Sequence, residues 1–197
     1  MARSPSLRVA FVQARAVDES LALCDVAGAL LERGHRPRLF LDHHERDLGA
    51  ALRRWDPDLL VVQAAILAEP WLRRALGRLP TTPPRVLVGT GVTFDPDLLQ
   101  RADDPRLGAL RGEIDDPLVD LVERLSRGER LEDALPEVDG ALWIADGALH
   151  QRPLGPQPTL PGRAMPLRGL YFDAYPFLGR FPWKRFAGSR GCVHACG

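Results

Sequence analysis

Hydrophobic residues in the first 127 positions follow two alternating patterns. Short continuous apolar runs are typical of strands covered on both faces, and apolar residues recurring every three or four positions are typical of amphipathic helices. The apolar runs predict strands at 7–12, 38–41, 59–62, 85–88 and 107–110. The helical spacing predicts helices over 20–33, 48–55, 70–79 and 118–125. This alternation predicts an α/β fold, in which a parallel sheet carries helices on both faces.

The first predicted helix has signals for its ends and for its buried face. Asp18 or Ser20 can cap its start, and Gly34 can end it because glycine adopts the left-handed conformation easily. One apolar stripe is expected to face the core: Leu23, Val26, Ala27, Leu30 and Leu31. Cys24 lies beside this stripe, where we expect a buried, unreactive thiol.

A ligand is expected at one end of this sheet. In open parallel sheets, ligands bind beyond the carboxyl ends of the strands, where the strand order reverses. The loops that begin at Gln13, Gln63, Gly89 and Arg111 follow predicted strands and are therefore the candidates. Residues 17–20 of the first loop could line the same pocket, although Asp18 and Ser20 serve equally well as helix caps.

The pattern changes after Gly128. Two short apolar runs around Asp146-Gly147 predict a hairpin over 141–151, because Asp-Gly is a favoured hairpin turn. Prolines and aromatic side chains then dominate, with no sustained period, which indicates a partly extended connector packed on another surface. We therefore divide the chain into a sheet domain (1–140), a hairpin and connector (141–183) and a distinct last segment (184–197).

Composition excludes several classes of partner. The 26 Lys and Arg residues balance the 26 Asp and Glu residues, so no net charge draws the chain to nucleic acid or to an anionic membrane. The first five residues lack an apolar signal core, and the apolar stretch 59–68 is too short to span a bilayer. The hydrophobic content of 45% is sufficient for a core, and we expect a cytoplasmic protein.

Two cysteines lie close together near the end of the sequence. Cys192 and Cys196 have C-x3-C spacing, and Gly191 before them allows a tight backbone turn that brings two sulfur atoms toward one metal. A chance pair of small buried residues has the same spacing, so the pair alone carries little information. His194 between them is expected to be a spacer and not a ligand.

The surrounding passage, SRGCVHACG at 189–197, resembles the start of the radical S-adenosylmethionine signature C-x3-C-x2-C. The resemblance implies that Cys192 and Cys196 ligate a 4Fe-4S cluster, whose open iron binds S-adenosylmethionine and receives an electron from a donor protein. The third cysteine of the signature would fall two positions beyond Gly197. We therefore expect a fragment that lacks the catalytic barrel and is inactive alone.

The whole layout is similar to that of cobalamin-binding radical S-adenosylmethionine proteins. The resemblance implies that residues 1–140 form a flavodoxin-like or Rossmann-like domain that binds cobalamin, and that 184–197 contains the first strand of a missing barrel. It also implies methyl transfer, or related radical chemistry, on an unreactive carbon. Two glycine-containing turns match the family's landmarks and supply the expected cofactor-binding residues: Gly89, Thr90, Gly91, Thr93, Gly112 and Glu113.

The sequence departs from the family pattern at several places. Thr90 stands where a second glycine is usual, and Ile114-Asp115 replaces a common Gly-Glu pair. The Asp-x-His-x-x-Gly motif that supplies a lower cobalt ligand is missing from 13–20, and we expect His43 and His44 to be solvated loop residues. Ordinary strand-end turns explain the glycines as well. Two alternatives stay open: a non-catalytic flavodoxin-like binding module and a corrinoid carrier.

Overall fold

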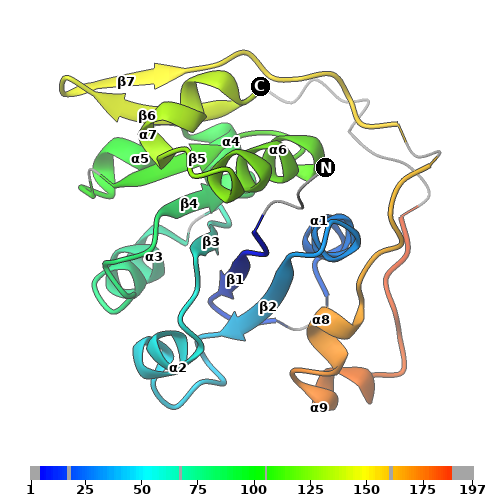
Figure 1. The fold of residues 1–197 in the computed structure, drawn as a ribbon. Coiled ribbons are helices and arrows are strands. Elements are labelled where there is room, and N and C mark those ends of the chain that lie inside the picture. Colours follow the sequence, from blue (N-terminus) through cyan, green and yellow to red (C-terminus); the bar gives the residue numbers. More distant parts are fainter. Residues whose placement is uncertain (1–4, 17–18, 67, 105, 160–161, 188–197) are drawn as a thin grey trace.

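The fold is built on one seven-stranded mixed sheet (Figure 1). The computed structural model describes residues 5–16, 19–66, 68–104, 106–159 and 162–187. The strands are β1 (Arg8–Gln13), β2 (Arg36–Leu41), β3 (Leu59–Gln63), β4 (Arg85–Val88), β5 (Leu107–Leu110), β6 (Ala141–Ala145) and β7 (Ala148–Gln151). Their spatial order is β2-β1-β3-β4-β5-β6-β7, with β1 to β5 parallel and the last two strands antiparallel. The predicted α/β class is confirmed.

Helices cover both faces of the sheet. They are α1 (Leu21–Glu32), α2 (Leu48–Trp55), α3 (Glu69–Leu76), α4 (Thr90–Phe94), α5 (Leu98–Arg101), α6 (Asp115–Ser126), α7 (Leu131–Ala134), α8 (Gly169–Phe172) and α9 (Pro176–Gly179), with a 3-10 turn, η1 (Leu135–Glu137), after α7. One face is covered by α2 to α5, and the other by α1, α6 and α7, with α8 and α9 beside α1 (Figure 1). Among the described residues, no helix is both long and apolar enough to cross a membrane.

The central strand β3 shows why the continuous apolar runs form this sheet. All four residues from Leu59 to Val62 are buried, and alternate side chains enter different cores. Leu59 and Val61 pack under α1 and α6, whereas Leu60 and Val62 pack under α2 and α3. A strand buried on both faces needs apolar residues at every position. The continuous apolar run at 59–62 therefore predicted β3 reliably.

The first helix confirms most of its sequence signals. Gly34 has a φ of +89°, and the amide of His35 donates to the carbonyl of Leu30 at 3.0 Å, which closes the end of α1 as expected. Leu31 is 50% exposed, so its assignment to the buried stripe was wrong. Leu30 already occupies the core-facing position, and the next residue is rotated by about 100° around the helix axis.

The hairpin is continuous with the sheet. Its turn has positive φ at Asp146 (51°) and Gly147 (74°), the conformation expected of a tight Asp-Gly turn. Strand β6 pairs antiparallel with β5, placing Leu142 opposite Ala109. Residues 141–151 therefore extend the sheet formed by 1–140.

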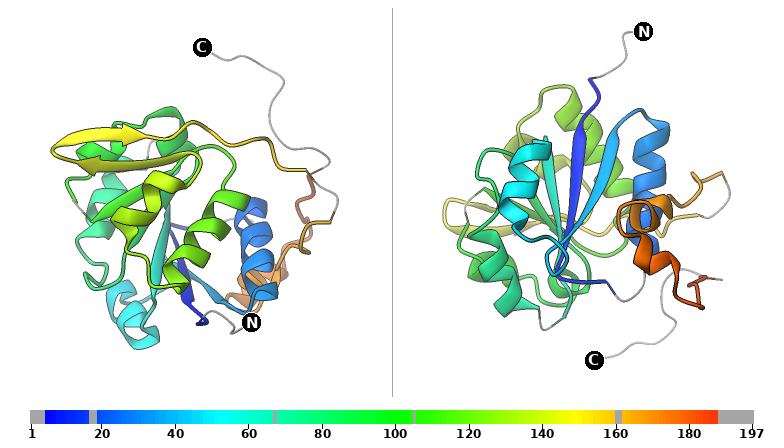
Figure 2. Two further views of the ribbon diagram at one scale, coloured as in Figure 1. Left: turned by 45° about the horizontal axis from the view of Figure 1, so that its top comes forward. Right: turned by 90° about the horizontal axis from the view of Figure 1, so that it is seen from below.

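The connector passes around the outside of α1, and its helix α8 lies beside α1 and contacts β2 (Figure 2, right). Its helices α8 and α9, with Tyr175 between them, place Leu170, Tyr171, Tyr175 and Leu178 in the same core as α1. The expectation that the aromatic connector packs on another surface is confirmed. Residues 184–187 have no regular secondary structure, and the rest of the predicted barrel strand lies outside the described residues.

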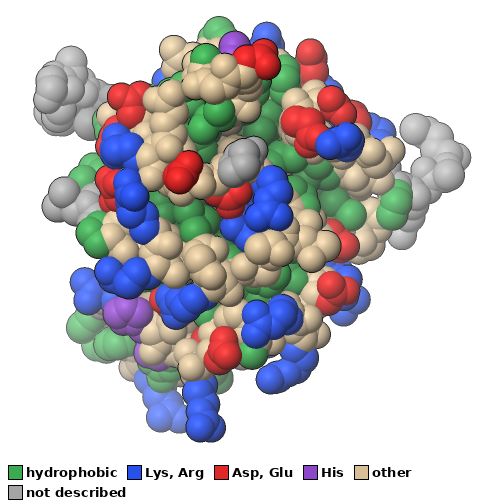
Figure 3. Space-filling model, turned by 90° about the vertical axis from the view of Figure 1, so that its left-hand side faces the viewer, with side chains coloured by type: hydrophobic (Ala, Val, Ile, Leu, Met, Phe, Trp, Pro, Cys, Tyr) green, Lys and Arg blue, Asp and Glu red, His purple; other side chains and the backbone are tan. Residues whose placement is uncertain are grey.

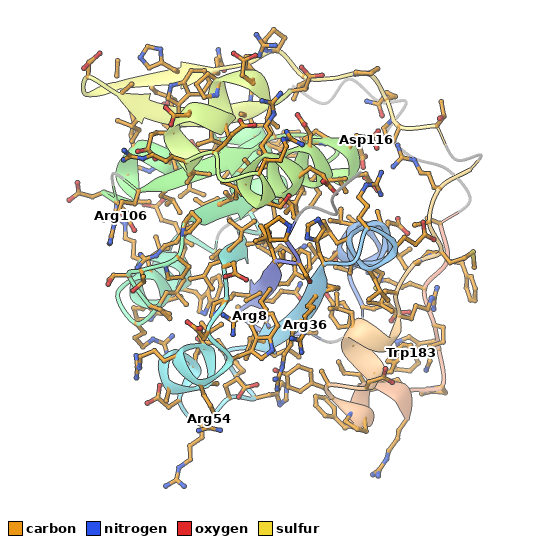
Figure 4. All side chains as sticks on the ribbon, in the orientation of Figure 1. Arg8, Arg36, Arg54, Arg106, Asp116 and Trp183 are labelled. Carbon is orange, nitrogen blue, oxygen red and sulfur yellow. The ribbon has the colours of Figure 1, made fainter. Side chains whose placement is uncertain are left out.

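Charge is unevenly distributed over the surface, although the net charge is zero. Figure 3 looks onto the side covered by α2, α3 and α5, where Lys and Arg side chains gather toward the lower half. The exposed arginines here include Arg53 and Arg54 on α2, and Arg73 and Arg74 on α3. Figure 4 shows Arg54 pointing away from the protein and Asp116 lying near the passing connector, where Arg163 pairs with it at 2.7 Å.

Candidate functional site

The strand order reverses between β1 and β3, and this reversal creates a crevice at their carboxyl ends. The chain leaves β1 toward one face of the sheet and β3 toward the other, so the two following loops diverge. Two adjacent hollows of about 520 and 380 Å³ lie there, and both are lined by Gln13, Arg15 and Gln63. We call this pair of hollows the switch-point site.

A chain of hydrogen bonds fixes the two glutamines that line the site. The hydroxyl of Tyr171 donates to Oε1 of Gln13 at 2.6 Å, and Nε2 of Gln13 donates to Oε1 of Gln63. Nε2 of Gln63 then donates to the Ser20 hydroxyl at 3.3 Å. Each amide oxygen is held by a donor, so each amide nitrogen has a defined direction.

The loop after β1 contributes two further groups to the smaller hollow, Glu19 and Ser20. Ser20 precedes α1 but makes no side-chain cap bond, so its expected capping role is not fulfilled. Its hydroxyl instead accepts the bond from Gln63. Glu19 is buried and pairs with Arg168 of the connector at 2.8 Å. Asp18, the other expected cap, lies outside the described residues.

The glycines of the loop after β4 allow two loops to lie in direct contact. Gly89 has a φ of +104°, and the Gly91 amide donates to the Ala64 carbonyl at 2.8 Å. A β-carbon would lie 2.9 Å from that oxygen at Gly89 and 2.8 Å from it at Gly91. Both glycines are therefore required by the packing between the loops after β3 and β4. Thr90 lies on the surface, and its hydroxyl accepts a bond from the Ile66 amide at 3.3 Å.

Thr93, on α4, joins the segment after β4 to the loop after β5. Its hydroxyl donates to the Gly89 carbonyl at 2.9 Å and accepts from the Gly112 amide at 3.0 Å. Gly112 has a φ of +73° and, with Glu113, lines a separate hollow of about 270 Å³ beside Leu154. The structure thus divides the six predicted cofactor-binding residues between two places. Among the described residues, none of the six lines the switch-point hollows.

The two histidines after β2 have different surroundings. His43 is exposed at the rim of the larger hollow, and His44 is exposed but lies against the rings of Tyr175 and Phe177, with centroid distances of 6.0 and 4.6 Å. Their interpretation as surface loop residues is confirmed. The packing of His44 on the connector was not expected from the sequence.

Asp42, next to His43, fixes the position of a side chain that lines the larger hollow on the β2 side. Its carboxylate accepts bonds from Trp71 Nε1 at 2.8 Å and from Arg78 at 2.7 Å. Burial disfavours the charged form, but the hydrogen bonds from Arg78 and Trp71 outweigh it and keep the pKa of Asp42 below its usual range. Trp71 is thereby fixed as one wall of the hollow.

Of the three cysteines, the structure describes Cys24 alone. Cys24 is buried on α1, and burial, together with the nearby charges of Glu19 and Asp25, raises the pKa of its thiol to about 12. The prediction of an unreactive thiol is consistent with this environment. Cys192 and Cys196 lie outside the described residues, and within the described ranges no group of three or more His, Cys, Asp or Glu residues is arranged to hold a metal.

Sequence reasoning marked Gln13 and Gln63 only as the starts of loops. A usable signal was present, because each glutamine directly follows four consecutive apolar residues, which end in Val12 and Val62. Polar residues at adjacent carboxyl ends of parallel strands face the same crevice. Tyr171 had no comparable signal, since it lies 158 residues from its partner.

The fold is similar to that of a solved enzyme structure. The structure is that of a radical S-adenosylmethionine methyltransferase, TsrM, from Kitasatospora setae, with cobalamin and a [4Fe-4S] cluster bound. The match covers 82% of this chain with a TM-score of 0.64 and 17% sequence identity. This chain spans 31% of that protein's length, and at this identity the likeness shows a shared fold. No family model and no curated protein matches the sequence.

Proposed function

We propose that this chain is the cobalamin-binding part of a radical S-adenosylmethionine protein that depends on a 4Fe-4S cluster. Its reaction would be methyl transfer or related radical chemistry on an unreactive carbon. The observation that carries the proposal is the crevice at the carboxyl ends of β1 and β3, in a fold similar over 82% of the chain to a protein solved with cobalamin. The passage around Cys192 and Cys196 supports it independently.

The side chains around the crevice suit a corrinoid. A corrin ring is flat, has apolar faces and carries amide groups around its rim, so its site needs open apolar surface and neutral hydrogen-bonding groups. Gln13, Gln63 and Ser20 provide the neutral groups, beside the charged Arg15 that lines both hollows. Ile66, in the loop after β3, is 56% exposed, and Phe94, at the end of α4, is 74% exposed, which provides apolar surface near the same end of the sheet.

Each group has a defined task in this proposal. Bound cobalamin supplies a cobalt ion that can carry a methyl group. The Gln13 and Gln63 amides bind and orient the rim of the ring, and Gly89 and Gly91 hold the segments after β3 and β4 in close contact beside it. Thr90, Thr93, Gly112 and Glu113 remain proposed contacts at its margin. Cys192 and Cys196 would supply two thiolates to the cluster, as the sequence resemblance implies.

Corrinoid binding can be tested directly on the purified chain. The protein is mixed with hydroxocobalamin, passed through gel filtration and examined by visible absorbance. We expect about one corrinoid per chain to co-elute, and we expect Gln13→Ala combined with Gln63→Ala to reduce this amount severalfold. Arg130→Ala is the matched control, because Arg130 lies at another hollow, beside residues that precede β1, β4 and β5.

Two results would overturn the proposal. One is the absence of co-eluting corrinoid from the wild-type protein. The other is retention of a flavin nucleotide in place of corrinoid, since flavodoxin-like sheets bind such ligands at the same strand reversal. The second result would favour the non-catalytic binding module.

A further inference from the structure

The connector reaches the switch-point site through one buried side chain. Tyr171, at the end of α8, is fully buried, and its hydroxyl donates to Oε1 of Gln13 at 2.6 Å. Burial raises the pKa of this phenol well above its usual range, so the hydroxyl keeps its proton. Its oxygen also interacts with Ser20, and its proton is donated to Gln13. A segment distant in sequence thus makes a directed contact behind the wall of the site.

This contact determines which way both glutamine amides face. A glutamine amide can be turned by 180°, which exchanges its donor and acceptor ends. The Tyr171 hydroxyl holds Oε1 of Gln13, so Nε2 of Gln13 is directed to Gln63. Gln63 then directs its own Nε2 toward Ser20. Without the phenol, the order of donors and acceptors at the crevice is no longer fixed.

A second contact ties the connector to the same loop. Arg168, one turn before Tyr171, pairs with the buried carboxylate of Glu19 at 2.8 Å. Glu19 directly precedes Ser20, the last member of the hydrogen-bond chain. The connector therefore holds both ends of this chain of hydrogen bonds. It holds one end through Gln13 and the other through the backbone next to Ser20.

We infer that Tyr171 is a positioning residue for the ligand of the switch-point site, and that docking of the connector and ligand binding stabilise each other. The inference rests on the proposed function, because the ligand is taken to be a corrinoid that contacts Gln13 and Gln63. Coupling between two sites is reciprocal, so a docked connector raises corrinoid affinity, and bound corrinoid holds the connector in place.

The same connector contains a matched control. The Tyr175 hydroxyl donates to Glu45 at 2.7 Å and accepts from the Leu41 amide at 2.8 Å, so it has two partners of its own. Tyr175 is buried, as Tyr171 is, but its hydroxyl bonds with neither glutamine. Removing its hydroxyl perturbs the connector without disturbing the amide chain.

The test compares Tyr171→Phe with Tyr175→Phe by titration with hydroxocobalamin. Loss of one oriented hydrogen bond corresponds to about 1 kcal/mol, or about a fivefold loss of affinity. We expect about that loss in Tyr171→Phe and less than a twofold change in Tyr175→Phe. In a Gln13→Met background, Tyr171→Phe should have a smaller effect than in the wild type, because the route through Gln13 is already removed and only the interaction with Ser20 is left.

A second measurement uses the wild-type protein, so that it does not depend on the variants folding. Hydroxocobalamin should slow tryptic cleavage after Arg163 and Arg168, whose side chains pair with Asp116 and Glu19 in the docked connector. Equal affinities of the two phenylalanine variants, or unchanged cleavage with corrinoid bound, would overturn the inference while leaving the proposed function intact. Failure of the wild-type protein to bind corrinoid would remove both.

Discussion

The backbone carbonyl of Met165 lies directly against Gly28, in the middle of α1. A β-carbon at Gly28 would overlap this oxygen, and the amide of the nearby Leu167 donates to the Cys24 carbonyl at 2.8 Å. We predict that Gly28→Ala forces the connector away from α1 and lowers the free energy of unfolding by about 1–3 kcal/mol. Urea unfolding followed by circular dichroism measures this change.

Gly77→Ala is the control for that prediction. Gly77 has a φ of −67°, and the nearest atoms to an added β-carbon are 3.9 Å away. Alanine should fit there and stabilise the protein by about 0.4–1 kcal/mol, because it restricts the unfolded chain. Equal stability of the Gly28 and Gly77 variants would show that the connector does not depend on the close approach to α1.

We predict that Gly91→Ala separates the loops after β3 and β4. Its β-carbon would lie 2.8 Å from the Ala64 carbonyl oxygen and 3.0 Å from that of Ala65, and backbone atoms cannot move aside cheaply. Stability should fall by about 1–3 kcal/mol, and hydroxocobalamin should bind more weakly. Gln100→Ala, at an exposed position on α5, should change neither quantity. Unchanged corrinoid binding in Gly91→Ala would place the ligand away from these loops.

Acid should destabilise the protein through Asp42. The folded state lowers the pKa of this carboxyl below its ordinary value of 3.8, so its stabilising contribution is present above that pH and is lost as pH falls through the folded-state pKa. Asp42→Asn should reduce stability at pH 7 by about 1 kcal/mol and make the decrease below pH 4 shallower. Urea unfolding at pH 7 and pH 3 gives both values. Parallel pH profiles for the two proteins would exclude Asp42 as a source of the acid sensitivity.

Cys24 should resist alkylation in the folded protein. Burial raises the pKa of its thiol to about 12, so little thiolate exists at pH 8, and the side chain is inaccessible. We expect N-ethylmaleimide to leave the Cys24 peptide unmodified at pH 8 and to modify it fully in urea. Peptide mass mapping distinguishes this cysteine from the other two. Rapid modification without denaturant would contradict its assignment to the core.

The strands of the sheet could be predicted closely because most of them are buried on both faces. β4 and β5 have the predicted bounds, β3 extends one residue further, and β1 is shifted by one residue at both ends. β2 begins two residues earlier than predicted, at Arg36, because pairing with Arg8 of β1 extends it through polar positions. The helices α4 and α5 were missed, since five and four residues are too few to show a helical period.

The site was only partly predictable, because its key contacts are distant in sequence. The loops at Gln13 and Gln63 were placed correctly by the rule for strand ends. The role of Ser20 was not predicted correctly. Its hydroxyl could cap α1 or bond to Gln63, and in the structure it bonds to Gln63. The contact between Tyr171 and Gln13 depends on how the connector packs against α1 and β2. No local sequence pattern predicts this packing. The roles of Cys192 and Cys196 stay predictions.

The two outermost strands bear on how this chain behaves beside copies of itself. Exposed strand borders can recruit strands from other molecules and start aggregation. At β2, the Leu41 amide is already occupied by the Tyr175 hydroxyl, and at the opposite border β7 is only four residues long. In the described part of the chain, the bond from Leu41 to Tyr175 and the short length of β7 reduce the row of free amides at the two borders, so the connector and the hairpin also oppose edge-to-edge aggregation.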